Sequence, residues 1–453
     1  MSDSPERESG RARIIVDLAY GDSGKGTFVD YFVRRDGSDL VVRFNGGPQA
    51  AHNVVLPDGR HHAFSQFGSG GFVRDVRTLL SRFVVIEPYA LLNEAAHLAG
   101  VGVADPLGGL IIDARCRVIT PVQRVANILR ERSRGAAAHG TCGVGFGECV
   151  ADSLATPELA VRAGDFRSPG DLAARLRRAH EAKRDEIAPL CELADRDQAR
   201  ILDDPRWIDV FVERASRIVS EAAIVDTEVA DRTIRESRRL IFEGAQGVLL
   251  DEDFGFHPHT TWSRTTFANA ETLLDAAGFE GPHERIGIIR TYMTRHGAGP
   301  FVSQSSDGLT GLTEPHNRGD GPQGDFRVGV LDLVALRYAI DVCGRVDGLA
   351  ITHLDRLPLL PRSVCQQYAD ADGPLSRLPM IDAADLHRRS SLATRLQAMQ
   401  PVPLAFPMAR PGEFIRGIED ALGVPVRFVS MGPTYADKRV VDGQALRTDP
   451  PDW

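Results

Sequence analysis

The chain has 453 residues, with 53 Lys and Arg against 62 Asp and Glu and a formal net charge of −9. Its 43% hydrophobic and 25% charged residues are typical of a folded globular protein and exclude general disorder. The acidic balance argues against binding to nucleic acid or to a membrane surface through bulk charge. An anionic ligand would need a local cluster of donors.

The cysteine pattern and the first residues predict a cytoplasmic protein. Six cysteines without a CxxC pair in a chain of this length favour reduced thiols over a disulfide framework. No uncharged apolar run approaches the roughly 20 residues of a membrane-spanning helix. Residues 1–12, rich in Ser, Arg, Glu and Gly, are expected to form a disordered tail.

Strand and helix patterns alternate along residues 13–453. A β-branched run at 13–19 leads into a glycine-rich turn and a helical pattern at 28–34. Further buried strands are predicted at 40–44, 79–86, 110–112, 240–242, 285–290, 348–352 and 426–429. Strands alternating with helices predict an α/β protein, a single large domain with a mostly parallel central sheet covered by helices. The segment at about 168–239, rich in Ala, Arg, Glu and Leu, predicts a helical subdomain inserted into the sheet.

The glycine-rich loop at 21–27, GDSGKGT, follows the first strand and opens the first helix. Backbone N–H groups and the helix dipole favour a phosphate there, and Lys25 adds a point charge. The loop is not a standard Walker loop, because Ala19 stands where the leading glycine would be. A purely structural glycine turn is the alternative. An acid inside a phosphate loop makes Asp22 a candidate metal ligand or general base.

Three later loops carry polar residues that suit a nucleotide site. The loop at 44–53 ends in His52, either a structural histidine or an acid/base partner for Asp22. FEGAQG at 242–247 and the hydroxyl-rich loop at 260–266 can bind phosphate or base edges, or simply form capped turns. Asp355 follows a predicted strand, where its carboxylate would accept hydrogen bonds from guanine N1–H and N2–H and so select GTP over ATP. A carboxylate that only caps the next turn is the alternative.

Eight segments, taken together over roughly residues 13–440, resemble the landmarks of the adenylosuccinate synthetase family in order and spacing. They are GDSGKG, GGPQAAH, HGTCGVGFG, FEGAQGVLLD, TRHGAGPF, GVLDLVALRYA, THLDRL and SMGP. The resemblance implies a GTP- and Mg²⁺-dependent ligase that phosphorylates the 6-oxygen of IMP and displaces that phosphate with the amine of aspartate. It also implies a homodimer with a shared active site.

The resemblance also implies a role for each matching residue. Asp22 would be the base and a magnesium ligand, His52 would assist γ-phosphate transfer, and Gln246 would lie near the purine 6-position. The implied catalytic residues are Asp22, Lys25, His52 and Gln246. The implied GTP-binding residues are Gly21, Ser23, Gly24, Lys25, Gly26, Thr27, Asp355, Ser430 and Gly432. The implied residues for the substrate nucleotide are Gln49, Thr141, Gln246 and Thr261, and those for the metal are Asp22 and Ala51.

The sequence departs from the family at the substrate subsites. The TTGRRRR loop that clamps aspartate corresponds to residues 321–327, GPQGDFR, where Arg327 alone remains of the arginine run and Arg318 is the nearest substitute. Residues 148–156 contain no arginine or lysine where the family carries an arginine that reaches the partner's nucleotide. Gln49 and Ala51 replace an asparagine and a glycine beside His52. The motifs that resemble the GTP site of the family are retained.

These departures leave the substrates open. The leading hypothesis is an adenylosuccinate synthetase-like, GTP-dependent ligase that joins an amine to a purine nucleotide, IMP or an analogue. One alternative is a diverged paralogue in specialised nucleoside metabolism that uses another amine or nucleotide analogue. A second is a non-catalytic GTP-binding protein, and a third is an ATP-using kinase with no preference for guanine.

Overall fold

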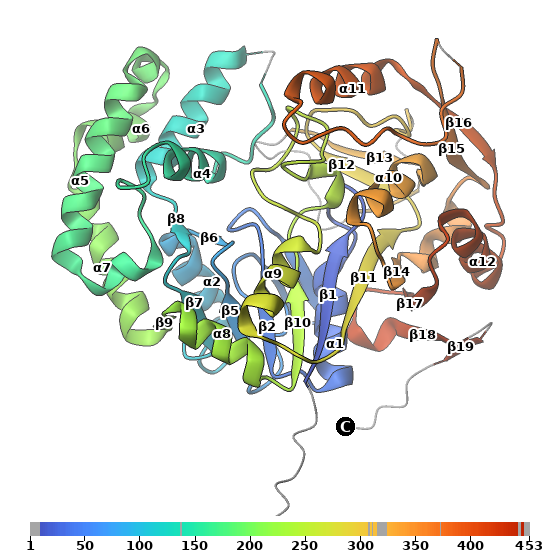
Figure 1. The fold of residues 1–453 in the computed structure, drawn as a ribbon, viewed down its shortest axis with the longest axis horizontal. Helices are drawn as coiled ribbons and strands as arrows, with labels where there is room; N and C mark the ends of the chain where they lie inside the picture. The colour runs from blue at the N-terminus through green and yellow to red at the C-terminus, as the bar shows by residue number, and fades with distance from the viewer. Residues whose placement is uncertain are drawn as a thin grey trace, which may run out of the picture.

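The structure, a computed structural model, describes residues 10–135, 138–306, 309, 311–314, 324–371, 373–442 and 445–447. Eleven strands of this part of the chain form a central sheet in the order β19-β18-β17-β14-β11-β1-β10-β2-β5-β7-β9 (Figure 1). All neighbouring strands in it are parallel except β17–β18 and β18–β19. The prediction of an α/β fold with a mostly parallel sheet is confirmed.

The strands of this sheet are β1 (Arg11–Asp17), β2 (Leu40–Arg43), β5 (Arg77–Leu80), β7 (Leu110–Asp113), β9 (Ala223–Val225), β10 (Arg239–Glu243), β11 (His283–Arg290), β14 (Gly348–Thr352), β17 (Val426–Ser430), β18 (Lys438–Asp442) and β19 (Ala445–Arg447). Three antiparallel strand pairs lie outside it, namely β3 (His52–Val55) with β4 (His61–Phe64), β12 (Met293–His296) with β13 (Phe326–Gly329), and β15 (Ser363–Ala369) with β16 (Gln400–Ala405). The sequence patterns did not predict these short strand pairs.

Two predicted boundaries are wrong. β1 begins at Arg11 rather than Arg13, because Arg11 and Ala12 pair with the first residues of β10. The predicted tail of residues 1–12 therefore does not extend to its last two residues, and residues 1–9 lie outside the described part of the chain. The strand predicted at 79–86 is two strands, since the chain turns after β5 and β6 (Val85–Ile86) pairs instead with β8 (Arg117–Val118).

Alternation along the strands buries both faces of the sheet. In β1, Ile15 packs with Phe28 and Phe32 of helix α1 (Lys25–Asp36) on one face. Ile14 and Val16 belong to the large core on the other face, which is covered by α8 (Thr227–Glu236), α9 (Ala268–Ala277) and α10 (Leu333–Cys343). Successive side chains of the strand thus point to opposite faces, and both faces are buried because helices cover them.

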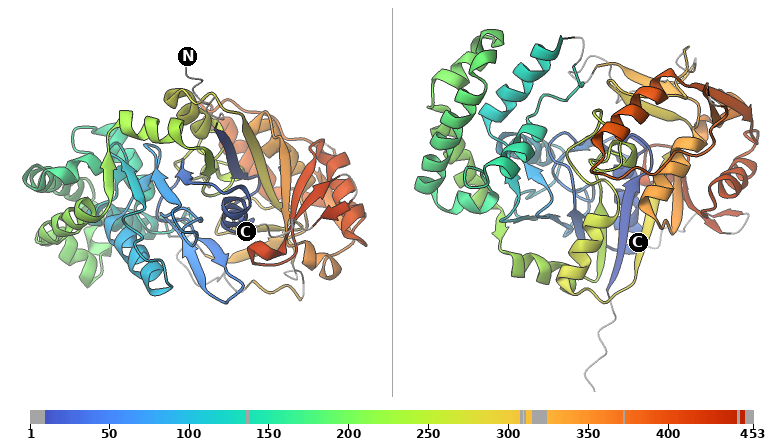
Figure 2. Two further views of the ribbon diagram at one scale, coloured as in Figure 1. Left: turned by 90° about the horizontal axis from the view of Figure 1, so that it is seen from below. Right: turned by 45° about the horizontal axis from the view of Figure 1, so that its top comes forward.

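The other helices gather at the two ends of the sheet. Seen from below in Figure 2, a helical group lies at one end and the C-terminal elements at the other. These helices are α2 (Pro88–Gly100), α3 (Pro121–Arg134), α4 (Phe146–Ala155), α5 (Pro169–Glu186), α6 (Arg196–Asp203), α7 (Trp207–Glu221), α11 (Leu386–Ala398) and α12 (Pro411–Leu422). No helix of the described residues has both the length and the apolar character needed to cross a membrane.

The segment predicted as a helical subdomain, about 168–239, holds α5 to α8 but is not purely helical. The short strand β9 lies between α7 and α8 and pairs with β7 at the edge of the sheet. Leu172 and Leu176 of α5 and Phe211 of α7 belong to a second core shared with α3. Lys183 of α5 is 5% exposed and donates hydrogen bonds to Asp152 of α4 at 2.5 Å and to Glu186 at 2.6 Å, which ties this segment to α4.

The carboxyl ends of the parallel strands lie along the same side of the sheet, and the loops that leave from there form the site. The loops after β1, β2, β10, β14 and β17 all leave from that side. In a parallel sheet the crevice outside the carboxyl ends is where ligands bind. The predicted loops at 21–27, 44–53 and 242–247 and the segment with Asp355 follow β1, β2, β10 and β14, whereas the hydroxyl-rich loop at 260–266 lies further along the chain after β10.

We predict that replacing Lys183 with Met lowers the free energy of unfolding. The change removes the cation that Glu148, Asp152 and Glu186 share, although Arg130 still pairs with Glu148 and Glu186. The loss should be about 2 kcal/mol, less than the 3–5 kcal/mol of a fully buried pair, because Glu186 is partly exposed. Urea unfolding measures it. Arg184→Met is the matched control, since Arg184 and its partner Asp203 are both exposed, and an equal loss in the two variants would contradict the prediction.

Candidate active site

A cavity of about 1070 Å³ opens at the carboxyl edge of the sheet. This volume lies at the upper end of the usual range for ligand sites, so it has room for more than one small molecule. The predicted residues that line it are Gly21, Asp22, Gly24, Lys25, Gly26, Thr27, Gln49, Ala51, His52, Thr141, Gln246, Thr261, Asp355, Ser430 and Gly432. Ser23 is buried behind the loop rather than lining the cavity, and Arg327 also lies outside the lining.

A buried carboxylate shapes the phosphate loop. Asp17, the last residue of β1, accepts hydrogen bonds from the backbone of Ala19 at 2.9 Å and of Ser23 at 2.8 Å. The Lys25 ammonium lies 3.3 Å from the same carboxylate. Gly21 and Gly24 have φ of 98° and 92°, in the left-handed region that glycine adopts without strain. The glycines and Asp17 together fold the loop back over the end of the strand.

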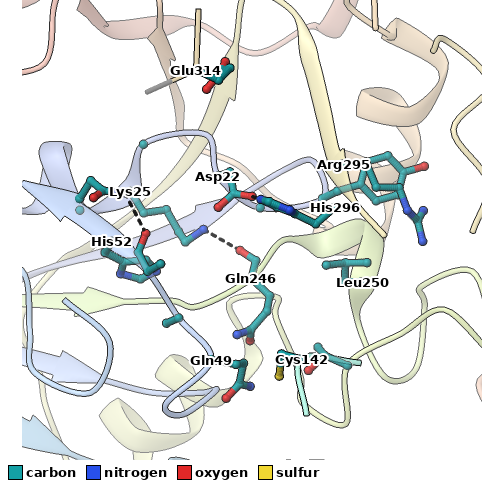
Figure 3. Close-up of a pocket in the computed structure, with 18 of the residues that line it drawn as sticks. Asp22, Lys25, Gln49, His52, Cys142, Gln246, Leu250, Arg295, His296 and Glu314 are labelled. Carbon is teal, nitrogen blue, oxygen red and sulfur yellow. Dashed lines mark hydrogen bonds and ion pairs between the residues drawn. The ribbon is translucent and has the colours of Figure 1, made fainter. Parts of the chain in front are cut away.

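Helix α1 points its N-terminus into the cavity. Its N-cap residue is Gly24, which offers no side chain to satisfy the first N–H groups of the helix. Lys25 adds its charge there and donates to the carbonyl of Gln246 at 2.7 Å (Figure 3). Free N–H groups, the helix dipole and an ammonium form a site for a phosphate group.

His52 is oriented by a buried glutamate. The His52 Nδ1 and a carboxylate oxygen of Glu243 are 2.6 Å apart, and the backbone and hydroxyl of Ser69 also donate to Glu243. Burial alone would raise the pKa of Glu243, but the Arg43 charge and the bonds from His52 and Ser69 lower it to about 2. Burial lowers the pKa of His52 below its usual value, against the opposing effect of Glu243.

An ionised Glu243 fixes the imidazole tautomer of His52. Nδ1–H donates to the carboxylate, so Nε2 is the nitrogen left to exchange a proton with a ligand. A Cβ on Gly26 would lie 2.8 Å from the Cβ of His52, so α1 needs glycine at that position to accommodate the histidine. The arrangement suits His52 for proton transfer or hydrogen bonding to a phosphate beside Lys25.

Two glutamines present unused amide groups to the cavity. Both amide atoms of Gln49 and the Oε1 of Gln246 are buried and have no hydrogen-bond partner among the described residues. A buried amide without a partner costs about 1–3 kcal/mol, so such groups are normally satisfied by a ligand or water. Gln246 also has φ of 57°, a conformation that a residue other than glycine rarely adopts. Gln49 and Gln246 therefore indicate a polar subsite of the cavity.

One end of the cavity is built by the turn after β17. Thr27 of α1 donates to the carbonyl of Pro433 at 2.8 Å, which joins the phosphate loop to this turn. Lys438 donates to the carbonyls of Gly432 and Thr434, and its burial lowers its pKa to about 7. Asp355 lines the same cavity from the 3₁₀ helix Leu354–Leu359 and pairs with the neighbouring Arg356 at 3.1 Å.

The opposite wall lies at the N-terminus of α4. Thr141 accepts a hydrogen bond from the Asn127 side chain at 3.1 Å, and its backbone donates to Glu131. Thr261 is held by a backbone bond to Leu250, and Trp262 beside it is 50% exposed. Hydroxyls and an aromatic ring thus line this wall.

The structure places Arg327 away from the cavity. Its guanidinium donates to the side chain of Gln304 and to the carbonyl of Gly299, both at 3.1 Å. In the β12–β13 hairpin it lies opposite Arg295, whose guanidinium is bonded to the carbonyls of Ala298 and Pro300. Both arginines therefore support the turn at 298–300. Arg318, the other residue expected at the amine subsite, lies outside the described residues.

Magnesium fits the oxygen atoms that are present. Asp22 offers a carboxylate and Ala51 a carbonyl, both at the cavity wall, and oxygen is the donor that magnesium prefers. Among the described residues no three His, Cys, Asp or Glu side chains are grouped to hold a metal. This donor set suits a metal that takes one or two protein ligands and the rest from substrate phosphates.

The sequence patterns missed four residues of the site. Asp17 and Glu243 each end a buried strand, a position at which an acid is unusual, so that position was an available signal. Arg290 and His296 contact Asp22, the first at its carbonyl and the second 3.4 Å from its carboxylate. Arg290 ends β11 and His296 ends β12; His296 lies in the segment TRHGAGPF noted above, but the pattern gave neither residue a contact with Asp22.

An α/β sheet with a phosphate loop, an oriented histidine and an acid at one cavity defines a nucleotide-binding enzyme that transfers phosphoryl groups. The comparisons specify it further. The sequence profile of the family "Adenylosuccinate synthetase" matches residues 14–438. Adenylosuccinate synthetase 1 of Pseudoalteromonas translucida is 31% identical over 95% of this chain and 99% of its own length. That of Heliobacterium modesticaldum is 29% identical over 93% and 96%.

Solved structures agree in fold. The fully ligated adenylosuccinate synthetase of Plasmodium falciparum superimposes with a TM-score of 0.76 at 20% identity, over 95% of this chain and 99% of that one. The succinoaminodeoxyadenylate synthetase of cyanophage S-2L, solved with dGMP and dATP, gives a TM-score of 0.61 at 17% identity, over 96% and 97%. The chain belongs to the adenylosuccinate synthetase family, GTP-dependent ligases that form a carbon–nitrogen bond.

We predict that Glu243→Gln lowers kcat about 100-fold or more, because an amide neither fixes the Nδ1–H tautomer of His52 nor stabilises its cation. KM for GTP should change little, since Glu243 is buried behind the histidine. Steady-state kinetics measures both constants. Glu284→Gln is a control, a glutamate paired with Arg13 outside the cavity, and wild-type kinetics in Glu243→Gln would contradict the role given to the pair.

Proposed function

We propose that this enzyme uses GTP to phosphorylate the 6-oxo group of a purine nucleotide, IMP or an analogue, and then displaces that phosphate with an amine. The observation that carries the proposal is the convergence of Asp22, Lys25, His52 and Gln246 on one cavity. A carbonyl oxygen is a poor leaving group, and phosphorylation turns it into a good one. The site has to hold two nucleotides face to face, for which the cavity has the volume.

Each converging side chain has a part in the first step. Asp22 accepts the N1 proton of the purine, which makes the 6-oxygen nucleophilic. Lys25 and the N-terminus of α1 hold the phosphates of GTP, and His52 Nε2 hydrogen-bonds the γ-phosphoryl group as it moves. The free amide of Gln246 lies where it can bond the 6-oxygen or its phosphate. Magnesium, held by Asp22 and Ala51 together with the phosphates, would neutralise charge on the transferring group.

The second step uses an amine whose recognition differs from that of the family. The arginine run of the family is reduced to Arg327, whose side chain bonds the turn at 298–300 and Gln304 instead of facing the cavity. A bidentate arginine contact to a carboxylate is among the stronger polar contacts in proteins. These observations support a diverged member that takes an amine other than aspartate or holds aspartate in another way.

We also propose that the enzyme acts in the cytoplasm as a homodimer on small molecules alone. The resemblance to the family supports the dimer. The six cysteines all lie among the described residues and none of them forms a disulfide, which suits a reducing compartment.

Positional isotope exchange tests the first step by itself. GTP labelled with oxygen-18 in the β–γ bridge is incubated with magnesium and an acceptor, IMP, GMP or dGMP, without any amine. Scrambling of the label that requires the acceptor is the expected result, and Asp22→Ala should abolish it while GTP binding is retained. Absence of exchange with every acceptor, in protein that binds GTP, would favour the non-catalytic GTP-binding alternative.

The amine is then identified by adding donors one at a time. GDP formation is measured with aspartate and with a panel of other amino acids and simple amines. Turnover with another amine and not with aspartate is the expected result. Fast turnover with IMP and aspartate would instead make this a housekeeping adenylosuccinate synthetase.

We predict that Asp355→Asn reduces the preference for GTP over ATP. The change removes a carboxylate that accepts hydrogen bonds from guanine N1–H and N2–H, bonds to a charged group that contribute about 1.5–3 kcal/mol each. A loss of about 100-fold in kcat/KM for GTP is expected, with ATP little affected. Asp341→Asn, at an exposed ion pair with Arg377 outside the cavity, is the control. Unchanged nucleotide selectivity would remove Asp355 from the base site.

A further inference from the structure

Asp22 is held in a conformation that its own backbone disfavours. Its φ is 61°, in the left-handed region, which costs a residue with a Cβ about 1 kcal/mol. The neighbouring glycines Gly21 and Gly24 occupy that region freely, but Asp22 does not. Its side chain is 32% exposed, toward the cavity. Such strain persists only where surrounding contacts hold the residue in place.

Arg290 holds the main chain of Asp22. This arginine is 5% exposed, and its Nε donates to the Asp22 carbonyl at 2.7 Å. The same guanidinium donates to the hydroxyl of Tyr292 at 3.0 Å and to the carboxylate of Glu314 at 2.6 Å. The guanidinium of Arg290 is thus held through Nε and Nη1, and its bond from Nε holds the carbonyl of Asp22 in place.

His296 holds the other end of the residue. Its Nε2 lies 3.4 Å from Oδ2 of Asp22, and Figure 3 shows the imidazole directed at the carboxylate. The ring packs against Phe326 with the centroids 4.7 Å apart, and Phe326 is its direct partner across the β12–β13 hairpin. The strand pairing and the contact with Phe326 therefore restrict the position of the imidazole.

Of the two carboxylate oxygens of Asp22, only Oδ2 is contacted by His296. Oδ2 faces His296, so Oδ1 is the oxygen that remains for a ligand. Lys25 and His52 lie on the other side of Asp22 in Figure 3. His296 therefore approaches the acid from the side opposite to the phosphate-binding groups. A proton acceptor whose carboxylate is fixed in this way needs no reorganisation when the substrate binds.

We propose that His296 is a positioning residue for Asp22, which donates a hydrogen bond from Nε2 to Oδ2 and so directs Oδ1 at the N–H of the acceptor. This inference rests on the proposed function, because it takes Asp22 as the group that removes that proton. Arg290 supports the same geometry through the main chain. Nothing in the motif comparison assigned a role to either residue.

Two substitutions separate donation by His296 from its packing. His296→Phe keeps a ring against Phe326 and removes the donor, whereas His296→Gln keeps an N–H donor at the same distance along the side chain. We expect His296→Phe to lower kcat and the isotope-exchange rate about 10- to 100-fold, the usual effect of losing a group that orients a functional side chain. KM for GTP and the affinity for GTP measured by calorimetry should stay within about twofold. His296→Gln should recover most of the rate.

The matched control is His283→Phe, at a partly exposed histidine on β11 that lies 4.0 Å from Glu271, outside the cavity. It should behave as the wild type. An undiminished exchange rate in His296→Phe would overturn this inference alone, as would an equal loss in folded His296→Phe and His296→Gln, because donation would then not matter. Absence of exchange in the wild-type enzyme would overturn the proposed function and this inference with it.

Discussion

The site depends on one buried carboxylate, Asp17 at the end of β1. It accepts two backbone N–H groups of the following loop and faces the ammonium of Lys25, so it determines where α1 begins. Through Lys25 it also fixes the carbonyl of Gln246, and thereby the loop after β10. A carboxylate buried without such partners would be costly. The loops of two adjacent strands are therefore held in register by a group that need not touch any substrate.

A second constraint is the edge at which the parallel strands end. Because β1, β2, β10, β14 and β17 point the same way, their following loops meet even though some of them lie hundreds of residues apart in the chain. Residues that have no local reason to be related, such as Asp22 and Asp355, then line one cavity. In the proposed function, the sequence departures from the family fall on segments assigned to the acceptor and the amine, while the phosphate-loop and guanine-side motifs are retained in the sequence.

The strands of the central sheet were predictable because a parallel sheet buries both faces and so leaves continuous β-branched runs. The strand pairs β3–β4 and β12–β13 were not predictable, since short strands with polar residues such as His61 and Arg295 leave no such run.

The glycine-rich loops predicted where the cavity lies. The pattern did not predict the contacts of single side chains: Arg327, which the sequence places at the amine subsite, donates to the carbonyl of Gly299 in the turn at 298–300. Contacts across the chain, as between His52 and Glu243, follow only from the folded geometry.

The three lysines of the chain, Lys25, Lys183 and Lys438, are 3%, 5% and 2% exposed. Each ammonium donates hydrogen bonds to oxygen atoms of the protein. All other basic side chains in the sequence are arginines or histidines. The folded surface therefore offers no lysine amine. Acylating reagents, aldehydes and lysine-directed modifying enzymes have no lysine to attack there, and reaction at Lys183 or Lys438 would report an opening of the interior. Of the three lysines, only Lys25 borders the cavity. Protection of Lys25 from these reagents by bound nucleotide would therefore distinguish occupancy of the site from unfolding.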